Sequence, residues 1–509
     1  MARFVNFQKI DKSSWYWYRH FQGRRRSVTD DPNNDQLKWQ TAVHNALRAW
    51  HKQDSTAEEL LESLLIVQLA RRELPNPADQ ANRRMATNAV LEKALDKLAQ
   101  QQEEYASILR WRFISKDKLF VVANRLNVSP DYVSRVQKKA IIQLTAVILA
   151  EEAAARAKYT SRLEARLKAP SYSRLFGRDA LVETVISQLL APESPWLVAL
   201  AGIGGIGKTS LADRIARQII PTLRFEEIYW LDVAPGTLSG QFSSPQTTFQ
   251  SLLSNLLLQL FPHTTIPAAT DEQRLTAVRR SLQERPSLVI IDNLEMASDM
   301  ALLINSLYDL AGPSKFLLTT RAQISRQANV FPVTVDELSL ADAGEFIRYQ
   351  AQETGIEAVA EATDEDIAAI YKLTGGNPLA LKIVISLLDM MPLDAILAGL
   401  TTDHPREVAQ MYRRIYWQAW QTLSDDARRL LKAMPLVGDE ADAEYLAQIS
   451  QLSQGALWRA VEELRQRSLL EVHGGLHEKQ YRVHPLTNSF LQTEIINLPL
   501  DDEDVMRDV

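Results

Sequence analysis

The chain has 509 residues, a length that predicts about three domains at roughly 150 residues each. Its 57 Lys and Arg residues against 63 Asp and Glu give a net charge of −6, which excludes a polybasic surface along the whole chain but allows a local basic patch. Because it has no cysteine, disulfides, thiolate metal sites and cysteine nucleophiles are excluded. Residues 1–20 lack the apolar core of a signal peptide, and no run of about 18 apolar residues occurs. We therefore expect a soluble, cytoplasmic protein with no membrane partner.

The first part of the chain, residues 1–77, is expected to be a helical region. Apolar side chains recur at helical spacing between residues 36 and 72, and Pro75 breaks the pattern. An aromatic cluster at Trp15–Tyr18 stands beside the basic run Arg24–Arg26. The cluster could stack on nucleic-acid bases, but we favour buried aromatic side chains next to a solvated basic turn.

Residues 78–150 carry the pattern of a helix-turn-helix domain. Two helical stretches flank the sequence NVSPD at residues 127–131. Ser129 can cap the second of these helices, and Pro130 fits its first position. Residues 95–144 resemble the fourth-region helix-turn-helix of sigma factors and their relatives.

The charge of this segment favours DNA as a partner. Residues 110–139 hold eight basic and two acidic side chains, a difference of +6. Basic side chains on the exposed face would contact DNA phosphates, and Arg135 could read base edges in the major groove. The candidate DNA-binding residues are Arg125, Tyr132, Ser134, Arg135, Lys138 and Lys139. Helical trios of this kind also form protein-interaction domains, and that alternative stays open.

Residues 151–172 are expected to be a helical linker. Tyr159, Leu163 and Leu167 recur every four residues, which indicates one helix with a narrow apolar seam that Pro170 ends. Such a helix would act as a semi-rigid strut.

Residues 173–335 change to short apolar runs separated by helical stretches. The runs, each of strand length, are residues 196–202, 227–233, 287–293 and 315–320. Continuous apolar strands that alternate with helices indicate a parallel sheet covered by helices on both faces. The predicted fold class is therefore multidomain, α/β in this part and all-α in front of it.

The most specific motif runs from Gly202 to Thr209 and fits GxxxxGK[ST] between an apolar strand and a helical stretch. Glycines let consecutive backbone N–H groups converge on phosphate oxygens, and the following helix directs its positive end at the same anion. Lys208 can reach the β- and γ-phosphates of ATP, and the Thr209 hydroxyl can bind Mg²⁺. The candidate nucleotide-binding residues of the loop are Gly202, Gly204, Gly205, Gly207, Lys208, Thr209 and Ser210.

A nucleotide site of this kind needs a second anchor for the metal. Asp292, at the end of the strand at 288–291, is the best candidate. Arg321 follows the next strand, where its guanidinium could meet the γ-phosphate; a structural ion pair is the alternative for this side chain. Lys208, Asp292 and Arg321 are therefore the candidate catalytic residues, and Thr209 and Asp292 the candidate metal ligands.

From residue 176 to residue 495 the chain resembles the STAND ATPases of the AP-ATPase/NB-ARC type, the switch module of apoptotic and plant-resistance signalling proteins and of many bacterial regulators. The motifs that carry the resemblance, in the family's order, are FGRD (176–179), GIGGIGKTSLA (202–212), IYWLDV (228–233), LVIIDNLE (288–295), FLLTTR (316–321), GGNPLAL (375–381) and YRVHPL (481–486). The resemblance implies a P-loop NTPase sheet with a helical lid and a winged-helix domain, and ATP or ADP with Mg²⁺ as ligands.

The resemblance also implies roles for residues outside the P-loop. In the family, the arginine that matches Arg178 lies near the nucleotide, the proline that matches Pro378 packs against it, and the histidine that matches His484 senses the ADP phosphate.

Two positions depart from the family's pattern. Asn293 stands where many relatives have a second acidic residue, and asparagine cannot act as a general base. We therefore expect slow hydrolysis, or hydrolysis that uses Glu295. Pro485 replaces the aspartate of the family's MHD element.

We divide the second half into a P-loop nucleotide-binding domain at 173–335, a helical domain at 336–402, a winged-helix domain at 403–497 and an acidic tail at 498–509. The winged-helix domain is expected to contain a β-hairpin that turns at Gly474-Gly475.

The leading hypothesis is an ATP/ADP switch that couples nucleotide exchange and homo-oligomerisation to a DNA-binding, transcription-regulator-like N-terminal effector. One alternative is a defence-type NB-ARC signalling ATPase whose helical N-terminus recruits protein partners. Another is an ATP-dependent remodelling enzyme with constitutive turnover. Many relatives carry a sensor array after the winged helix, and this chain stops at Val509. We therefore expect sensing by a separate protein, by the N-terminal region, or by another part of a longer gene product.

Overall fold

A computed structural model describes residues 32–52, 60–75, 79–193, 195–233, 245–262, 270–294, 300–320, 330–400, 408–437, 440–467, 469–475 and 478–496. The chain divides into two compact units, residues 1–164 and residues 165–509, and each is described by itself. The aromatic and basic runs at residues 15–26 and the acidic tail at 498–509 lie outside the described residues.

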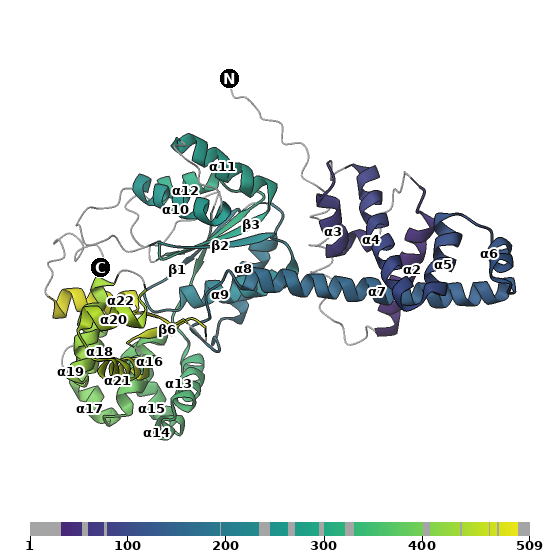
Figure 1. Cartoon of the computed structure of the whole chain (residues 1–509). Helices are drawn as coiled ribbons and strands as arrows, with labels where there is room; N and C mark the ends of the chain where they lie inside the picture. The colour runs from purple at the N-terminus through teal and green to yellow at the C-terminus, as the bar shows by residue number, and fades with distance from the viewer. Residues whose placement is uncertain are drawn as a thin grey trace. The chain divides into compact units, whose positions relative to one another are not determined.

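The described residues of the first unit form helices and the turns that join them (Figure 1). Its elements are α2 (Pro32–Arg48), the 3₁₀ turn η1 (Leu60–Ser63), α3 (Leu65–Arg72), α4 (Gln80–Gln101), α5 (Glu103–Leu109), the π-turn η2 (Arg110–Ile114), α6 (Leu119–Leu126) and α7 (Pro130–Glu164). Leu47 of α2, Leu95 of α4 and Leu144 of α7 are fully buried in one shared core. The apolar stripes at helical spacing therefore face one another, as the sequence predicts.

The helix-turn-helix pattern is present in α6 and α7. Asn127 adopts the left-handed conformation (φ 56°) that ends α6, and the Ser129 hydroxyl accepts a hydrogen bond from the Tyr132 N–H at 3.2 Å. Val122 and Val133 are fully buried in a small core of their own. The turn thus forms with the predicted capping hydroxyl and Pro130 at the first helical position, and the structure adds a residue that tolerates positive φ.

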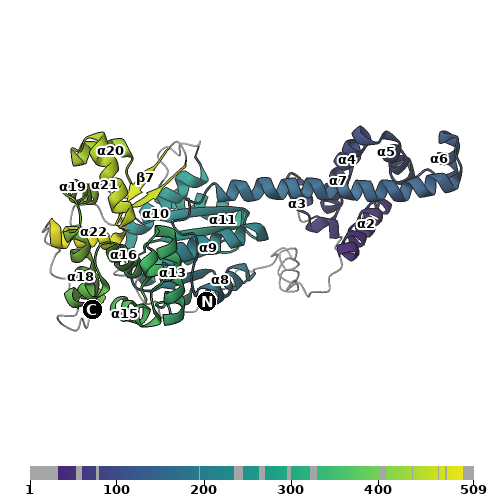
Figure 2. The ribbon, with the colours of Figure 1, turned by 90° about the horizontal axis from the view of Figure 1, so that it is seen from below.

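Helix α7 is one continuous helix of 35 residues (Figure 2). It contains both the second helix of the helix-turn-helix and most of the predicted linker. The helix ends at Glu164, earlier than the predicted end at Pro170.

A buried carboxylate joins α7 to α3. Glu152 of α7, only 5% exposed, accepts hydrogen bonds from the backbone N–H groups of Leu65 (3.0 Å) and Ile66 (3.1 Å). The first turn of α3 has no cap from its own sequence neighbours, so a distant side chain satisfies its free N–H groups. The Arg156 guanidinium pairs with the same carboxylate and balances its charge.

The second unit begins with a five-stranded parallel sheet. Its strands are β1 (Leu197–Ala201), β2 (Glu227–Asp232), β3 (Ser287–Asp292), β4 (Lys315–Thr320) and β5 (Val330–Thr334), in the order β2-β3-β4-β1-β5. The helices around it are α8 (Asp179–Leu190), α9 (Lys208–Ile219) with the short turn η3 (Ile220–Thr222), α10 (Pro245–Leu260), α11 (Asp271–Glu284) and α12 (Met300–Tyr308). All residues of β1, β3 and β4 are buried, because helices lie on both faces of the sheet (Figure 1).

The remaining helices form a lid and a winged-helix part. The lid helices are α13 (Leu340–Thr354), α14 (Glu357–Ala360), α15 (Asp364–Thr374), α16 (Pro378–Leu388) and α17 (Leu393–Leu400). The winged-helix part contains α18 (Val408–Gln421), α19 (Asp425–Ala433), η4 (Met434–Leu436), α20 (Ala443–Ser450), α21 (Gln454–Gln466), β6 (Glu471–His473), β7 (Gln480–Arg482), α22 (Pro485–Phe490) and the π-turn η5 (Leu491–Ile495). Strands β6 and β7 form the predicted antiparallel hairpin, in which Gly474 has a φ of +105°.

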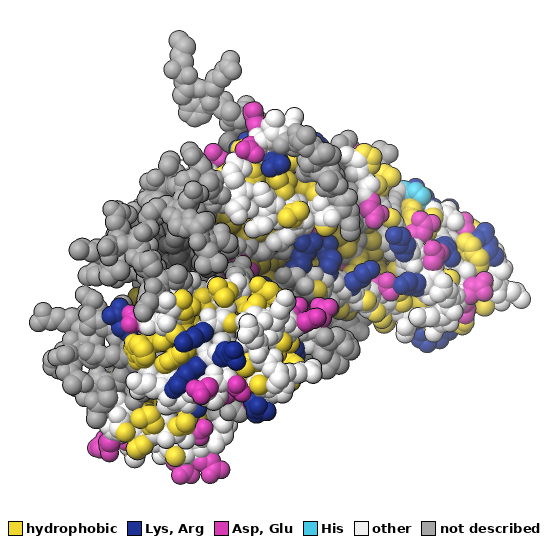
Figure 3. All heavy atoms as spheres, turned by 60° about the vertical axis from the view of Figure 1, so that its left-hand side comes forward, with side chains coloured by type: hydrophobic (Ala, Val, Ile, Leu, Met, Phe, Trp, Pro, Cys, Tyr) yellow, Lys and Arg dark blue, Asp and Glu magenta, His cyan; other side chains and the backbone are white. Residues whose placement is uncertain are grey.

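The lid and the winged-helix part share one apolar core. Val384 of α16, Ile415 of α18 and Leu457 of α21 are buried in the same cluster. Some large apolar side chains of the winged-helix part stay exposed, among them Leu436 and Trp458. On the face drawn in Figure 3, apolar side chains lie among Lys and Arg side chains over the lower part of the picture.

The predicted fold class is confirmed: a parallel P-loop-type sheet with a helical lid and a winged-helix part, and a helical N-terminal unit with a helix-turn-helix. Among the described helices, none is both long enough and apolar enough to cross a membrane.

Candidate nucleotide-binding site

The loop between β1 and α9 has a conformation that requires glycine. Gly205 (φ 72°) and Gly207 (φ 96°) lie in the left-handed region. A Cβ atom on Gly205 would stand 2.8 Å from Cβ of Leu379, and one on Gly202 would stand 2.6 Å from the Val335 carbonyl oxygen. The loop therefore keeps its shape only without side chains at these positions.

Lys208 begins α9 and its side chain lies along the loop. Its ammonium group donates hydrogen bonds to the carbonyl oxygens of Gly202 (2.7 Å) and Ile203 (3.0 Å), and the residue is 8% exposed. The positive charge is thus held at the N-terminal end of α9, where the helix dipole already favours an anion.

Thr209 and Asp292 meet at the end of the sheet. The Thr209 hydroxyl donates to Oδ1 of Asp292 at 3.0 Å, and the Thr319 hydroxyl donates to the same oxygen. Asp292 is 1% exposed, and this burial raises the pKa of its carboxyl group above the ordinary value despite the two hydroxyl donors. A buried carboxylate beside a hydroxyl is the oxygen donor set that Mg²⁺ prefers.

These residues fit a magnesium nucleotide. The glycine loop leaves the room that side chains would fill, and the N–H groups of α9 and Lys208 would meet the phosphates. Thr209 and Asp292 are near enough to each other to reach one metal ion. When bound, Mg²⁺ would neutralise phosphate charge and polarise the γ-phosphoryl group.

The lid contacts the phosphate loop directly through Asn377. Its side-chain nitrogen donates to the Gly204 carbonyl oxygen at 3.0 Å, while its Oδ1 accepts from the backbone N–H groups of Leu379 and Ala380 at the start of α16. The Leu379 N–H also lies 3.3 Å from the Gly205 carbonyl oxygen. Pro378, half-buried, stands between these two contacts. The motif GGNPLAL therefore lies against the P-loop, and Asn377 is a site residue that the sequence argument missed.

Arg178 directly precedes α8 and contacts the segment that leads into the lid. Its guanidinium donates to the Asp336 carbonyl oxygen at 2.5 Å, and burial lowers its pKa. The preceding Gly177 has a φ of 60°, and a Cβ there would lie 2.5 Å from the Asp342 carboxyl group. Phe176 packs edge-on against Phe346 with ring centroids 5.5 Å apart, which fixes this segment to α13.

His484 lies after the hairpin of the winged-helix part, next to a charged cluster. Glu471 of β6 accepts a hydrogen bond from Arg482 of β7 at 2.8 Å and lies 3.2 Å from Nε2 of His473. Burial alone would raise the pKa of Glu471, but His473, Arg482 and His484 together hold it well below its usual range. His484 therefore interacts electrostatically with a carboxylate of its own domain, and its contact with a nucleotide phosphate stays a prediction.

Two predicted catalytic residues, Arg321 and Glu295, lie outside the described residues. Asn293 is described: it has a φ of 61°, and its N–H donates to the Thr319 hydroxyl at 3.0 Å. Asp232, which the sequence argument did not select, ends β2 directly opposite Asp292 in the strand register. Its position as the last residue of an apolar strand was the available signal.

The candidate DNA-binding residues divide into two groups. Arg135, Lys138 and Lys139 are exposed on α7. The Tyr132 hydroxyl donates to Glu104 at 3.1 Å, and Arg125 lies over the Trp111 ring and pairs with Asp117 at 3.2 Å. Ser134 is half-buried. Arg125 is exposed as well but is engaged by Trp111 and Asp117, so Arg135, Lys138 and Lys139 are the exposed cations of this set on α7.

Comparison with known proteins agrees with this geometry. Residues 178–351 match the family model of the NB-ARC domain. The transcription activator GutR of Bacillus subtilis is 22% identical over 338 residues, which cover 61% of this chain and 39% of GutR. A probable disease resistance protein of Arabidopsis thaliana is 26% identical over 223 residues, 42% of this chain and 24% of that protein. The chain therefore spans well under half the length of these relatives.

A solved structure also resembles this chain. It is a signal transduction ATPase with numerous domains (STAND) from Pyrococcus horikoshii that has a tetratricopeptide repeat sensor. The two are 18% identical with a TM-score of 0.45, and the match covers 67% of this chain and 45% of the other. The match to the family model is the firmer finding: residues 178–351 of this chain match the NB-ARC domain.

Proposed function

We propose that this NB-ARC chain is an ATP/ADP switch that controls a DNA-binding N-terminal effector. One observation carries the proposal that the chain binds a nucleotide. It is the hydrogen bond of 3.0 Å between Thr209 and the buried Asp292, at the carboxyl end of the strands, where the P-loop leads into α9. The charge of a buried acid costs free energy, and a bound cation would offset that cost.

The proposed roles combine the described contacts of the loop with the roles that the family resemblance implies. Backbone N–H groups of Gly202, Gly204, Gly205, Gly207 and Ser210, with the Lys208 ammonium, bind the phosphates, and Thr209 and Asp292 hold Mg²⁺. Arg321 meets the γ-phosphate, Arg178 lines the nucleotide from the start of α8, and Pro378 lines it from the lid. His484 senses ADP from the winged-helix part. Hydrolysis is slow, because Asn293 cannot act as a base.

The proposed switch has two states. With ADP, the winged-helix domain (403–497) stays against the nucleotide-binding domain (173–335) and the helical domain (336–402). With ATP it moves away, and the chain forms a homo-oligomer. A ligand can drive this change only as far as its affinities for the two states differ.

Substitution of Lys208 tests the nucleotide half. Lys208→Ala is expected to weaken ADP binding by about ten- to a hundredfold, since a hydrogen bond to a charged group contributes roughly 1.5–3 kcal/mol. Titration calorimetry with ADP and Mg²⁺ measures it, and Lys372→Ala, an exposed lysine of α15, is the matched control. Unchanged affinity in Lys208→Ala would refute the site.

The DNA half rests on the exposed cations of α7. Arg135, Lys138 and Lys139 lie within the segment 110–139, which has a charge of +6 in a chain of −6. GutR, one relative, is named a transcription activator. The second helix of a helix-turn-helix contacts the major groove, so these side chains would meet phosphates and base edges.

A salt titration of duplex binding tests this half. Removing Arg135, Lys138 and Lys139 together is expected to reduce the slope of log affinity against log salt by about 1 for each lost phosphate contact. Lys158→Ala, an exposed lysine later in α7, is the control. A parent protein whose affinity for duplex does not depend on salt would rule out DNA as the partner.

A second candidate function is a defence-type signalling ATPase whose helical unit binds protein. The disease resistance relative favours this candidate. It predicts that the same triple variant binds duplex as the parent does but loses a protein partner in co-purification.

A further inference from the structure

Lys168 joins two parts of the second unit. Its ammonium group lies 3.1 Å from Oδ2 of Asp232, the last residue of β2, and 2.8 Å from Oε1 of Glu440 in the winged-helix part. Glu440 directly precedes Ala441, which forms a β-bridge with Tyr481 of the hairpin. A movement of the hairpin away from the sheet would therefore carry Glu440 away from Lys168.

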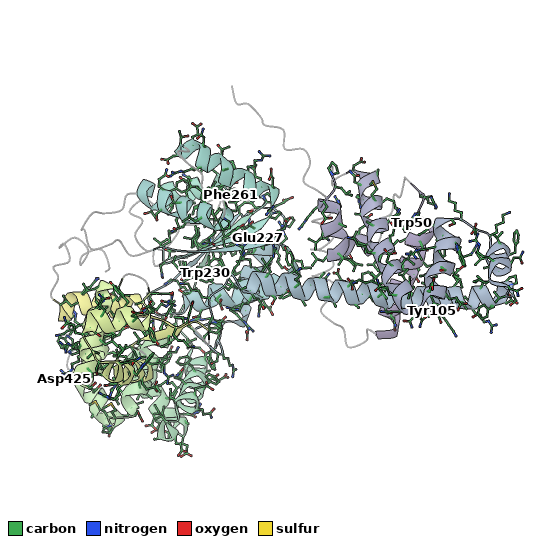
Figure 4. All side chains as sticks on the ribbon, in the orientation of Figure 1. Trp50, Tyr105, Glu227, Trp230, Phe261 and Asp425 are labelled. Atoms are coloured by element: carbon green, nitrogen blue, oxygen red, sulfur yellow. The ribbon has the colours of Figure 1, made fainter. Side chains whose placement is uncertain are left out.

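The segment that carries Lys168 is fixed to the nucleotide-binding part on both sides of the lysine. Arg166 pairs with Glu227 of β2 at 3.1 Å and lies over the Tyr229 ring. Figure 4 labels Glu227 and Trp230 on this edge strand. The Arg217 guanidinium of α9 donates to the Lys168 carbonyl oxygen at 2.6 Å. Tyr172 donates to Asp213 of α9 at 2.8 Å.

These contacts place the segment 166–172 along β2 and α9. Helix α9 starts at the phosphate loop, and β2 ends beside Asp292 in the strand register. The segment is therefore anchored to the two elements that carry the nucleotide site, while the Lys168 side chain reaches out to the winged-helix part.

A second cation faces the same acids. Arg482 of β7 lies 3.8 Å from Oε1 of Glu440 and interacts electrostatically with Asp232. Asp232 also accepts a hydrogen bond from the indole N–H of Trp230 at 3.1 Å. Asp232 and Glu440, which would repel each other, thus lie with Lys168 and Arg482 in one alternating cluster.

We propose that Lys168 is the central cation of an ionic clamp that holds the winged-helix part on the nucleotide-binding part in the ADP state. The clamp consists of Lys168, Asp232, Glu440 and Arg482. This inference rests on the proposed nucleotide switch. Opening removes Glu440 and Arg482 together, so Asp232 keeps one cation in place of two, next to the proposed metal ligand Asp292.

The clamp also couples the N-terminal unit to the release of the winged-helix part. Lys168 follows the last residue of α7, Glu164, after only a short connection in the chain. Since coupling between two sites is reciprocal, a partner that displaces the segment 166–172 favours release of the winged-helix part, and release of that part frees the segment.

The expected effect of one substitution is moderate. The side chains of Lys168, Asp232 and Glu440 are 46%, 31% and 23% exposed, and ion pairs at such sites are partly screened by water. Lys168→Ala is expected to speed ADP release by about two- to fivefold. Lys168→Glu, which repels both acids, is expected to speed it by about tenfold. Lys168→Arg keeps the charge and should behave as the parent does.

The first experiment uses the full chain and ADP with a fluorescent methylanthraniloyl group, whose release is followed after excess ADP is added. Lys97→Ala is the matched control, because Lys97 is 49% exposed and pairs with Glu151 in the first unit. Lys168→Ala combined with Glu440→Ala should release ADP no faster than Glu440→Ala alone, since both remove the same contact.

The second experiment measures opening without nucleotide. The chain has no cysteine, so Glu183→Cys on α8 and Glu444→Cys on α20, both exposed, accept a donor and an acceptor dye. In this background Lys168→Glu should lower energy transfer and Lys168→Arg should not. Equal transfer and equal release rates in the parent, Lys168→Ala and Lys168→Glu would overturn the clamp. A parent that binds no ADP but opens on Lys168→Glu would overturn the nucleotide switch and leave the ionic tie supported.

Discussion

The candidate nucleotide site and the helix-turn-helix represent two ways in which a chain can build a binding surface. Backbone shape and buried contacts determine the nucleotide site: glycines at positive φ, Asn377 against the loop, and a carboxylate at 1% exposure. At the helix-turn-helix, a small apolar core holds α6 and α7, and the candidate contacts are exposed side chains such as Arg135. A change in the first site therefore alters stability and binding together, whereas a change on α7 should alter binding alone.

The largest loss of ADP affinity and stability is expected at Gly205, where the packing leaves no room for a side chain. Gly205→Ala would place a Cβ 2.8 Å from Leu379 at a φ of 72°, so left-handed strain and overpacking together cost about 3 kcal/mol. ADP affinity should fall more than about tenfold, and the thermal midpoint should fall as well, because the loop and the lid shift together. Gly375→Ala has a φ of 59° and no heavy atom within 4 Å of the new Cβ, so it isolates the cost of strain. Equal effects in the two variants would show that Leu379 does not constrain the loop.

A smaller loss of stability, confined to the first unit, is expected when Glu152, the buried residue that caps α3, is replaced. Glu152→Ala leaves the N–H groups of Leu65 and Ile66 without their acceptor, at a cost of about 1–3 kcal/mol. Amide hydrogen exchange should become about tenfold faster or more in α3, while ADP affinity stays unchanged. Glu151→Ala, which loses only a surface pair with Lys97, serves as the control. Weaker ADP binding in Glu152→Ala would contradict the separation of the two sites.

The smallest effect on stability is expected from Asp292. A raised carboxyl pKa means that the folded protein holds the proton more tightly than the unfolded chain. The contribution of Asp292 to the free energy of unfolding therefore falls as the pH rises from 3.8, the ordinary pKa of an aspartate, through the raised pKa. Asp292→Asn removes this loss and keeps an acceptor for Thr209, so its thermal midpoint at pH 7 should equal or exceed that of the parent. The same variant should lose the effect of Mg²⁺ on ATP binding. A lower midpoint, with the Mg²⁺ effect kept, would argue against a metal role.

Short-range patterns in the sequence predicted much of the fold. The alternation of apolar runs and helical stretches indicated the parallel sheet, and the loop at residues 202–209 indicated the candidate phosphate site, because both depend on neighbours in the chain. Ser129 and Pro130 likewise predicted the start of α7. The end of α7 was placed wrongly at Pro170, because the apolar seam continues past Glu164 into a segment that folds onto β2 and α9.

The contacts that join the parts were decided only by the tertiary structure. Asn377 bonds to Gly204 across 173 residues of sequence, Lys168 pairs with Glu440 across 272, and Glu152 caps α3 across 87. No local period or motif encodes such pairs, because each depends on the register of a strand or the rotation of a helix that the whole core sets. The sequence by itself therefore determined that this chain has a phosphate loop, an acid beside it and a basic helix-turn-helix. The packing of the sheet, lid and hairpin determined which side chains connect the nucleotide site to the winged-helix part.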